Sequence, residues 1–145
     1  MAKKTPSKKE KQITCLTISG KRKRSIAKAT IKAGEGIIRI NKTNMEILPF
    51  FHRLALLEPI RIAQDVLKEL KFNIDVNVKG GGRESQIEAS RLAIARALVS
   101  FTKSQELRNA YANYDRSLLV ADVRRKEMYK PGDSKARAKR QKSYR

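Results

Sequence analysis

The clearest pattern of apolar and polar positions is a strict alternation over residues 72–79. Four apolar residues alternate with four polar ones, in the order Phe72, Asn73, Ile74, Asp75, Val76, Asn77, Val78 and Lys79. Because successive side chains on a strand point to opposite faces, this pattern predicts a strand with one buried and one polar face. A similar alternation over residues 26–33 predicts a second strand, with one face formed by Ala27, Ala29, Ile31 and Ala33.

Turn residues separate these strands from two further strand patterns. A β-prone run at residues 13–19 is followed by the charged segment Gly20–Arg24, which predicts a hairpin with a basic tip. Gly34, Glu35 and Gly36 predict a second tight turn that leads into a short strand at residues 37–40. This turn does not match a dinucleotide-binding loop, because a strand pattern rather than a helix follows it.

Two helical segments are predicted before the strand at residues 72–79. Residues 43–46 fit a capping box, which predicts a short helix that Pro49 closes or bends. Glu58 and Pro59 predict the start of another helix, because proline is favoured at the first helical position. The apolar face of this helix comprises Ile60, Ala63, Val66, Leu67 and Leu70.

Two more helices are predicted after that strand. Residues 85–88 fit a second capping box and predict a helix with an apolar stripe of Ile87, Ile94, Leu98 and Phe101. The last helix, over residues 105–114, has one face formed by Leu107, Ala110, Tyr111 and Tyr114. Residues 118–121 add a final apolar contact, and beyond residue 124 no periodicity remains.

Size and charge divide the chain into a body with basic ends. With 145 residues, no Trp, four Tyr and four Phe, the chain has room for one modest core. Net charge is +10 over residues 1–40, +2 over 41–123 and +8 over 124–145, out of +20 in total. We therefore expect a basic N-terminal arm at residues 1–12, an α+β domain at 13–123 and an extended basic tail at 124–145.

The basic ends predict a polyanionic partner. Such arms bind by displacing counterions, and we expect nucleic acid rather than a membrane, since no arm has the apolar face of an interfacial helix. Cys15 is the only cysteine, which excludes an intramolecular disulfide and favours a small residue buried on a strand. No apolar region follows the N-terminal lysines, so we expect no secretory signal. We therefore expect an intracellular location.

Candidate binding residues are found in two places in the body. Gly80–Gly82 before a helix is either a tight turn or a turn that also touches a phosphate, because free amides at a helix N-terminus attract anions. Arg91 and Arg96 are five positions apart and face different directions, so each is either solvated or in contact with a backbone phosphate.

Catalytic chemistry finds little support in the sequence. His52 is the only histidine and follows two phenylalanines, which favours a packed or surface imidazole over a general base. The acidic residues of the body are scattered among basic ones and form no close pair suited to acid–base or metal chemistry. We expect no cofactor and no metal.

Two blocks of the sequence are distinctive, namely residues 80–98, GGGRESQIEASRLAIARAL, and the ending QKSYR at residues 141–145. Both resemble small-subunit ribosomal protein nine, a family found on every ribosome. The ending is similar to the archaeal and eukaryotic form of the family, and the resemblance extends over roughly residues 13–145. Tyr129, Asp133 and Arg140 depart from the residues that the family usually has at those positions.

The resemblance implies a single α+β domain, in which a mixed or antiparallel sheet packs on helices with a left-handed βαβ crossover. It also implies a structural role in the head of the small ribosomal subunit in the cytoplasm, with no catalysis. The implied partners are small-subunit ribosomal RNA, peptidyl-site transfer RNA and neighbouring head proteins, with no membrane.

The expected contacts combine the residues above with this resemblance. Expected ribosomal RNA contacts are Lys21, Arg22, Lys23, Arg24, Gly80, Gly81, Gly82, Arg83, Arg91, Arg96, Arg124, Arg125, Lys130, Lys135, Arg137, Lys139 and Arg140. Expected transfer RNA contacts are Lys142, Ser143, Tyr144 and Arg145. The alternatives are a free nucleic-acid-binding protein or RNA chaperone, and an RNA-processing enzyme.

Overall fold

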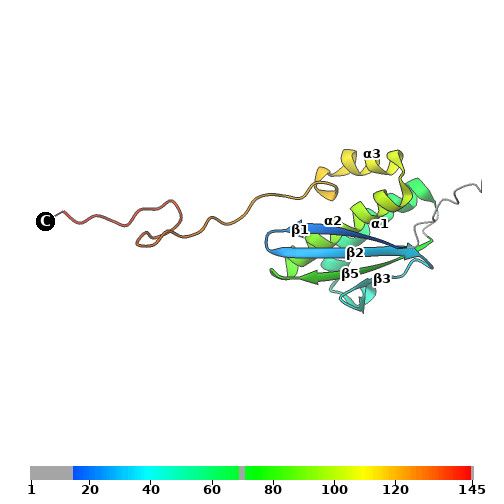
Figure 1. Ribbon diagram of the computed structural model, residues 1–145, viewed down its shortest axis with the longest axis horizontal. Coiled ribbons are helices and arrows are strands. Elements are labelled where there is room, and N and C mark those ends of the chain that lie inside the picture. Colours follow the sequence, from blue (N-terminus) through cyan, green and yellow to red (C-terminus); the bar gives the residue numbers. More distant parts are fainter. Residues whose placement is uncertain (1–14, 69–70, 145) are drawn as a thin grey trace, which may run out of the picture.

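A mixed five-stranded sheet forms one layer of the body (Figure 1). The computed structural model describes residues 15–68 and 71–144, so the predicted N-terminal arm, Leu70 and Arg145 lie outside the described residues. The strands are β1 (Leu16–Arg22), β2 (Ser25–Ala33), β3 (Ile38–Ile40), β4 (Thr43–Asn44) and β5 (Phe72–Lys79). Their spatial order is β1-β2-β5-β3-β4, and every neighbouring pair is antiparallel except the parallel pair of β3 and β5.

The predicted alternation places the core on one face of the sheet. The apolar positions of β5 are all buried, as are Ala27, Ala29 and Ile31 on β2. Ala33 was expected on the same face but is exposed, because it is the last residue of β2, where the strand leaves the core. The fold class predicted from the sequence is confirmed.

The predicted turn between β1 and β2 is shorter than expected. Strand β1 continues to Arg22, and only Lys23 and Arg24 form the turn, with Lys23 at a φ of 51°. Gly20 lies within the strand, where a Cβ atom would stand 2.4 Å from the carbonyl oxygen of Ala89. This glycine therefore allows a helix to pack directly on the sheet rather than turning the chain.

Three helices complete the body. Helix α2 (Arg83–Thr102) lies against β1, β2 and β5, α1 (Phe50–Leu67) packs beside α2, and α3 (Gln105–Tyr114) packs on α1. The bounds predicted for α3 are confirmed. Helix α2 is buried on most of its circumference, which is why the apolar stripe predicted for it was too narrow. Helix α1 lies between the parallel strands β3 and β5 in the chain and so supplies the helix of a βαβ crossover.

Two of the predicted helix starts are wrong. Thr43 and Asn44 pair with β3, and only a 3₁₀ turn follows at Met45–Ile47, so the capping box does not form. Helix α1 begins at Phe50 and continues through Pro59, where a new helix was predicted to start. Pro59 lacks an N–H donor, but it is buried, so tertiary packing outweighs the cost of a proline inside the helix.

A buried hydrogen bond joins α3 to α1 at this proline. The hydroxyl group of Tyr111 donates to the carbonyl oxygen of Pro59 at 2.6 Å, and Tyr111 is fully buried. Burial raises the pKa of the Tyr111 phenol, because ionisation would place a charge in an apolar environment. Tyr114, expected on the same face, is 60% exposed.

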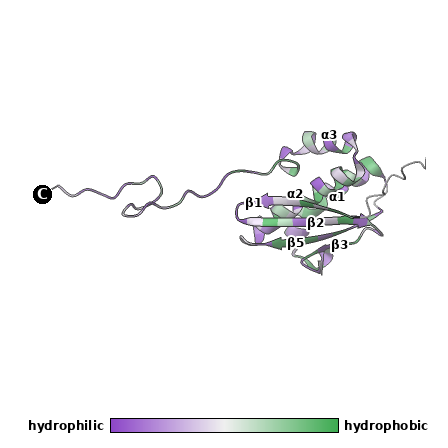
Figure 2. Cartoon of the chain, in the orientation of Figure 1, coloured by the Kyte–Doolittle hydropathy of each residue, from purple (hydrophilic) through white to green (hydrophobic). Residues whose placement is uncertain are grey.

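The C-terminal segment leaves the body as an extended chain (Figure 1). After the 3₁₀ turn at Arg116–Leu118, which buries Leu118, residues 121–144 contain no helix or strand. Figure 2 shows the apolar positions gathered in the body and a largely hydrophilic tail. A segment with so little apolar surface has nothing to bury against the body.

Candidate nucleic-acid interface

The structure brings two basic stretches that are distant in sequence, together with the start of α2, into one cleft. This basic cleft has a volume of about 990 Å³ and lies between the β1–β2 hairpin tip, the start of α2 and the first residues of the tail. Six of its ten lining residues are Arg or Lys, namely Arg22, Lys23, Arg24, Arg124, Arg125 and Lys126. Such a concentration of cations, with no acidic side chain lining the cleft, attracts phosphate groups.

The glycine turn supports one wall of the basic cleft. Gly80 and Gly81 have φ angles of 77° and 67°, which favour glycine. A Cβ atom on Gly81 would stand 2.1 Å from the hydroxyl oxygen of Ser25 and 2.6 Å from that of Ser85. The structure therefore shows the tight turn that the sequence predicted, whereas a phosphate contact at this turn stays a prediction.

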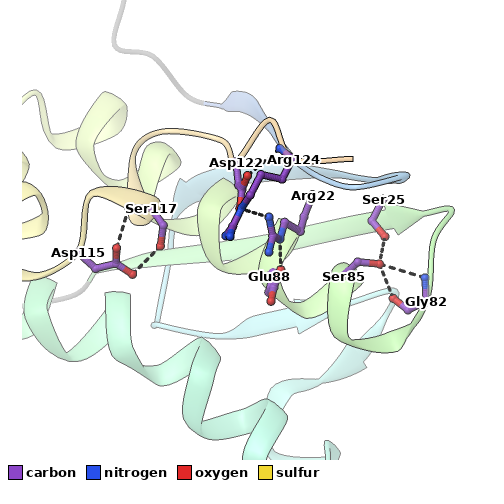
Figure 3. A network of polar contacts seen from close by, with 9 residues as sticks. All are labelled: Arg22, Ser25, Gly82, Ser85, Glu88, Asp115, Ser117, Asp122 and Arg124. Atoms are coloured by element: carbon purple, nitrogen blue, oxygen red, sulfur yellow. Dashed lines mark hydrogen bonds and ion pairs between the residues drawn. The ribbon is translucent and has the colours of Figure 1, made fainter. Parts of the chain in front are cut away.

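Two serines bind the hairpin to the start of α2 (Figure 3). The hydroxyl groups of Ser25 and Ser85 lie 2.8 Å apart, and Ser85 Oγ accepts a hydrogen bond from the N–H of Gly82 at 3.0 Å. Helix α2 therefore begins at Arg83 with Gly82 as its N-cap, whereas the sequence predicted Ser85 as the cap. Because Gly82 and Ser85 line the basic cleft, the positive end of the α2 dipole adds to its potential.

Arg22 connects the hairpin, α2 and the tail (Figure 3). Its guanidinium forms ion pairs with Glu88 on α2 and with Asp122 at the base of the tail. Asp122 also accepts hydrogen bonds from the backbone N–H and the Nε of Arg124, both at 2.8 Å. The hydrogen bonds from Arg124, together with Arg22, hold the pKa of the Asp122 carboxyl well below its usual range. We call Arg22, Glu88, Asp122 and Arg124 the tail clamp.

Arg96 contacts the segment directly before the tail. Its Nε donates to the carbonyl oxygen of Leu119 at 2.8 Å, and its Nη1 donates to that of Ser19 at 3.3 Å. Arg96 therefore joins α2 to β1 and to the segment that precedes the tail. Together with the tail clamp, it fixes the point at which the tail leaves the body.

Arg91 is likewise engaged within the protein. Its Nη2 lies 2.5 Å from Glu58 on α1 and 3.2 Å from Asp115 after α3. Asp115 accepts hydrogen bonds from the N–H and hydroxyl of Ser117, and chiefly the latter lowers the pKa of its carboxyl group. Arg91 thus connects three helical segments, and the phosphate contacts expected for Arg22, Arg91 and Arg96 stay predictions.

The tail contains a loop closed by ion pairs. The guanidinium of Arg137 donates to both carboxylate oxygens of Glu127, at 2.9 and 2.5 Å, and Lys139 lies 3.4 Å from Asp133. The Lys126 ammonium lies 4.5 Å from the ring centroid of Tyr129. Two of the three residues that depart from the family pattern, Tyr129 and Asp133, therefore contact cations of the tail itself.

Among the described residues, every cation predicted to bind ribosomal RNA or transfer RNA from the tail is exposed. They are Arg124, Arg125, Lys130, Lys135, Arg137, Lys139, Arg140 and Lys142. Ser143 and Tyr144 are exposed as well, whereas Arg145 lies outside the described residues. In the body, the exposed predicted cations are Lys21, Lys23, Arg24 and Arg83. The exposed residues among these can contact a polyanion without breaking a core contact.

Sequence reasoning missed the acidic residues that organise the interface. Glu88 and Asp122 lie far apart in the chain, and neither belongs to a motif, so nothing in the sequence indicates that both pair with Arg22. The one available signal was Asp122 as an acidic residue directly before the basic tail.

Other chemistry finds no support among the described residues. His52 Nε2 lies 2.8 Å from Glu84 Oε1, so the imidazole is a partly buried hydrogen-bonding group. Cys15 was expected to be buried but is exposed, because it precedes β1 and lies outside the core. Over residues 15–68 and 71–144, no group of three His, Cys, Asp or Glu side chains could hold a metal. Within the same ranges, no helix is long and apolar enough to cross a membrane.

The chain is similar in sequence to known proteins. A family model described as ribosomal protein S9/S16 matches residues 20–145. The chain is 47% identical over 129 residues to small ribosomal subunit protein uS9 of Methanococcus maripaludis (strain C5), covering 87% of this chain and 95% of that protein. It is 49% identical over 128 residues to the uS9 protein of Thermoplasma volcanium, covering 88% and 96%.

Proposed function

The chain belongs to the ribosomal protein S9/S16 family, and from this premise we propose which RNA contacts its body makes and which its tail makes. As a member of this family it is a structural component of the small ribosomal subunit and not an enzyme. Its partners are ribosomal RNA and other ribosomal proteins, and it acts at the cytoplasmic ribosome.

The basic cleft is the ribosomal RNA anchor of the body. The observation that carries this proposal is the convergence of the hairpin tip, the start of α2 and the first tail residues on one cleft. Exposed cations there neutralise backbone phosphates, and the amides at the start of α2 add a site for an anion. Lys21 and Arg83, which adjoin lining residues of the cleft in the sequence, are exposed as well.

Three arginines support this anchor mainly by contacts within the protein, namely Arg22, Arg91 and Arg96. Each guanidinium is already engaged by carboxylates or carbonyl oxygens of the body. A phosphate that approached one of them would therefore share the cation with an existing partner. Their main contribution is to hold α2, the hairpin and the tail base in one arrangement, which keeps the cations of the basic cleft together.

The tail is the second RNA-binding element, and its tip is the transfer RNA contact. Residues 124–145 span about 70 to 80 Å when fully extended, at about 3.3 to 3.6 Å per residue. The loop closed by Glu127 and Arg137 shortens this reach while it persists. Cations along the tail bind ribosomal RNA, and the last four residues, Lys142 to Arg145, contact peptidyl-site transfer RNA.

The experiment that tests the tip is a deletion of Ser143 to Arg145. Small subunits that carry the truncated protein are expected to assemble but to bind peptidyl-site transfer RNA more weakly, with a shallower dependence on salt. Equilibrium binding of transfer RNA across salt concentrations measures both quantities. Unchanged affinity in the truncated subunits would contradict the contact.

A longer deletion separates the tip from the anchor. Removing residues 124–145 also removes three of the six cations of the basic cleft. We expect this variant to be incorporated poorly into small subunits, as measured by co-sedimentation in moderate salt. Normal incorporation would show that the tail base is not part of the ribosomal RNA anchor.

A further inference from the structure

The sheet has a second face that the described helices leave open. The helices pack against the buried positions of β1, β2 and β5, so the alternate positions of these strands point away from them. On this open face lies a depression of about 770 Å³ that is separate from the basic cleft and shares no lining residue with it. Its charge is not explained by the tail or by the hairpin tip.

The depression is basic and polar. Three cations line it, Lys28 from β2, Arg39 from β3 and Lys42 from the turn after β3, and all three are exposed. The single acidic lining residue is Asp75, whose carboxylate lies 3.8 Å from Lys32 and is partly neutralised by it. The lining therefore carries a net positive charge.

The strand register fixes how these groups are spaced. Lys28 pairs with Asn77 across β2 and β5, and Thr30 pairs with Asp75, which in turn pairs with Arg39 on β3. The two cross-strand rows are two residues apart along each strand and therefore lie on the same face. At a rise of about 3.3 to 3.4 Å per residue, they are about 6.6 to 6.8 Å apart. Polar groups thus follow one another in rows across the sheet.

The open face is continuous with the hairpin tip. Lys21 pairs with Ile26, which pairs with Lys79, and this row lies next to the turn that contains Lys23. Both lysines of the row are exposed. A polyanion held at the basic cleft could therefore continue over the sheet without crossing an acidic surface.

We propose that the open face of the sheet, centred on Lys28, Arg39 and Lys42, is a second RNA-binding surface that holds a sugar–phosphate backbone. Its cations match phosphate groups, and the hydroxyl groups of Thr17 and Thr30 and the amides of Asn41 and Asn77 provide partners for phosphates and 2′-hydroxyls. No aromatic side chain lines the depression, so contacts there position RNA rather than stack on its bases.

A protein partner fits this surface less well. Protein interfaces usually centre on aromatic and other apolar side chains, and the only apolar lining residue here is Val76, which is 2% exposed. The inference rests on the proposed RNA binding but concerns residues that the basic cleft and the tail do not include.

The test compares two triple variants of the full-length chain in binding to purified small-subunit ribosomal RNA. The first is Lys28→Gln, Arg39→Gln and Lys42→Gln. The control is Arg61→Gln, Arg108→Gln and Arg116→Gln, which removes the same charge from exposed positions on α1, on α3 and in the 3₁₀ turn after α3. The dissociation constant is measured against salt concentration, and circular dichroism verifies that both variants are folded.

We expect the slope of log Kd against the logarithm of the salt concentration to become shallower by about 2 to 3 in the sheet variant, since each lost phosphate contact removes about 0.7 to 0.9 from it. The control should keep the wild-type slope, and a charge-conserving variant, Lys28→Arg with Lys42→Arg, should also keep it. A sheet variant that binds like the control would overturn the inference while leaving the basic cleft and tail intact. A wild-type chain with no salt-dependent affinity would overturn both.

Discussion

The guanidinium of Arg22, at the end of β1, is paired with the carboxylate of Asp122 at the base of the tail. The two side chains are only 19% and 21% exposed, so water and salt screen this pair less than they screen the ion pairs within the tail. An acidic residue therefore fixes where a basic tail begins. Without it, Arg22 and Arg124 would repel each other at the same place.

This arrangement predicts that Asp122→Asn loosens the tail without unfolding the body. The variant keeps a side chain of the same size but removes the charge shared by Arg22 and Arg124, so the tail base should leave the body more often. We expect dilute trypsin to cleave after Arg124 and Arg125 several-fold faster than in the wild-type protein, as followed by mass spectrometry.

The matched control is Asp133→Asn, which removes an acidic residue that contacts Lys139 within the tail and nothing in the body that the structure describes. Cleavage after Arg124 should be unchanged in this control. Equal cleavage rates in both variants would mean that the tail clamp does not hold the tail base.

The tail clamp also shows which features of the site could be predicted from the sequence. The basic character of the hairpin tip, the glycine turn and the tail was visible, because it depends on residue type alone. The pairing of Arg22 with Glu88 and Asp122 was not, since it depends on β1, α2 and the tail base meeting in three dimensions. For the same reason, Arg91 and Arg96 were predicted to be solvated or to contact a phosphate, and their partners within the protein were not predicted.

In the fold, too, the elements that depend on local sequence patterns were predicted, and those that depend on distant contacts were not. Strand β5 and helix α3 were predicted closely because their patterns are periodic and uninterrupted. Helix α1 was predicted to start only at Glu58 and Pro59, since proline is a strong local signal for a helix start and the packing that outweighs it is not local. Gly20 was placed in a turn because its role, the close approach of Ala89, requires the partner helix.

The glycine turn predicts a large difference between two neighbouring substitutions. In Gly81→Ala, the new Cβ atom would meet Ser25 Oγ at 2.1 Å, and alanine disfavours a φ of 67°. We expect a loss of roughly 2 to 4 kcal/mol in the free energy of unfolding, from backbone strain and the displaced serine pair. Urea denaturation measures this quantity.

Gly82→Ala serves as the control, because its Cβ atom would meet nothing within 4 Å and its φ is −107°. We expect a loss of at most about 1 kcal/mol, since alanine is a poorer N-cap than glycine. If both variants lose the same amount, the contact between the hairpin and the turn does not stabilise the body.

The buried phenol of Tyr111 predicts a specific response to alkaline pH. Its pKa is raised by burial, so the folded protein holds the proton more tightly than the unfolded chain does. The stability that this group contributes is complete below the unfolded pKa of about 10 and is lost as the pH rises above it. The free energy of unfolding should therefore decrease above about pH 10.

Tyr111→Phe should reduce this alkaline decrease, because it removes the titrating group. Near neutral pH the variant should lose about 1 kcal/mol, from the missing hydrogen bond to the Pro59 carbonyl oxygen. Tyr129→Phe, at a residue that is 57% exposed, is the control and should follow the wild-type pH profile. If the two variants have the same alkaline slope, the titrating group lies elsewhere.

The last prediction concerns exchange of lysine and arginine along the tail. Lys135 and Lys139 are exposed and are proposed to neutralise phosphates, which either cation can do, so Lys135→Arg and Lys139→Arg should leave subunit assembly unchanged. Arg137→Lys should instead open the loop with Glu127, because a lysine ammonium cannot donate two parallel hydrogen bonds to one carboxylate.

Arg145→Lys should weaken peptidyl-site transfer RNA binding, since a guanidinium group binds phosphate in a bidentate manner and a lysine ammonium does not. Transfer RNA affinity of subunits carrying each variant distinguishes these cases: a loss for Lys135→Arg equal to that for Arg145→Lys would mean that the tail tip has no special contact.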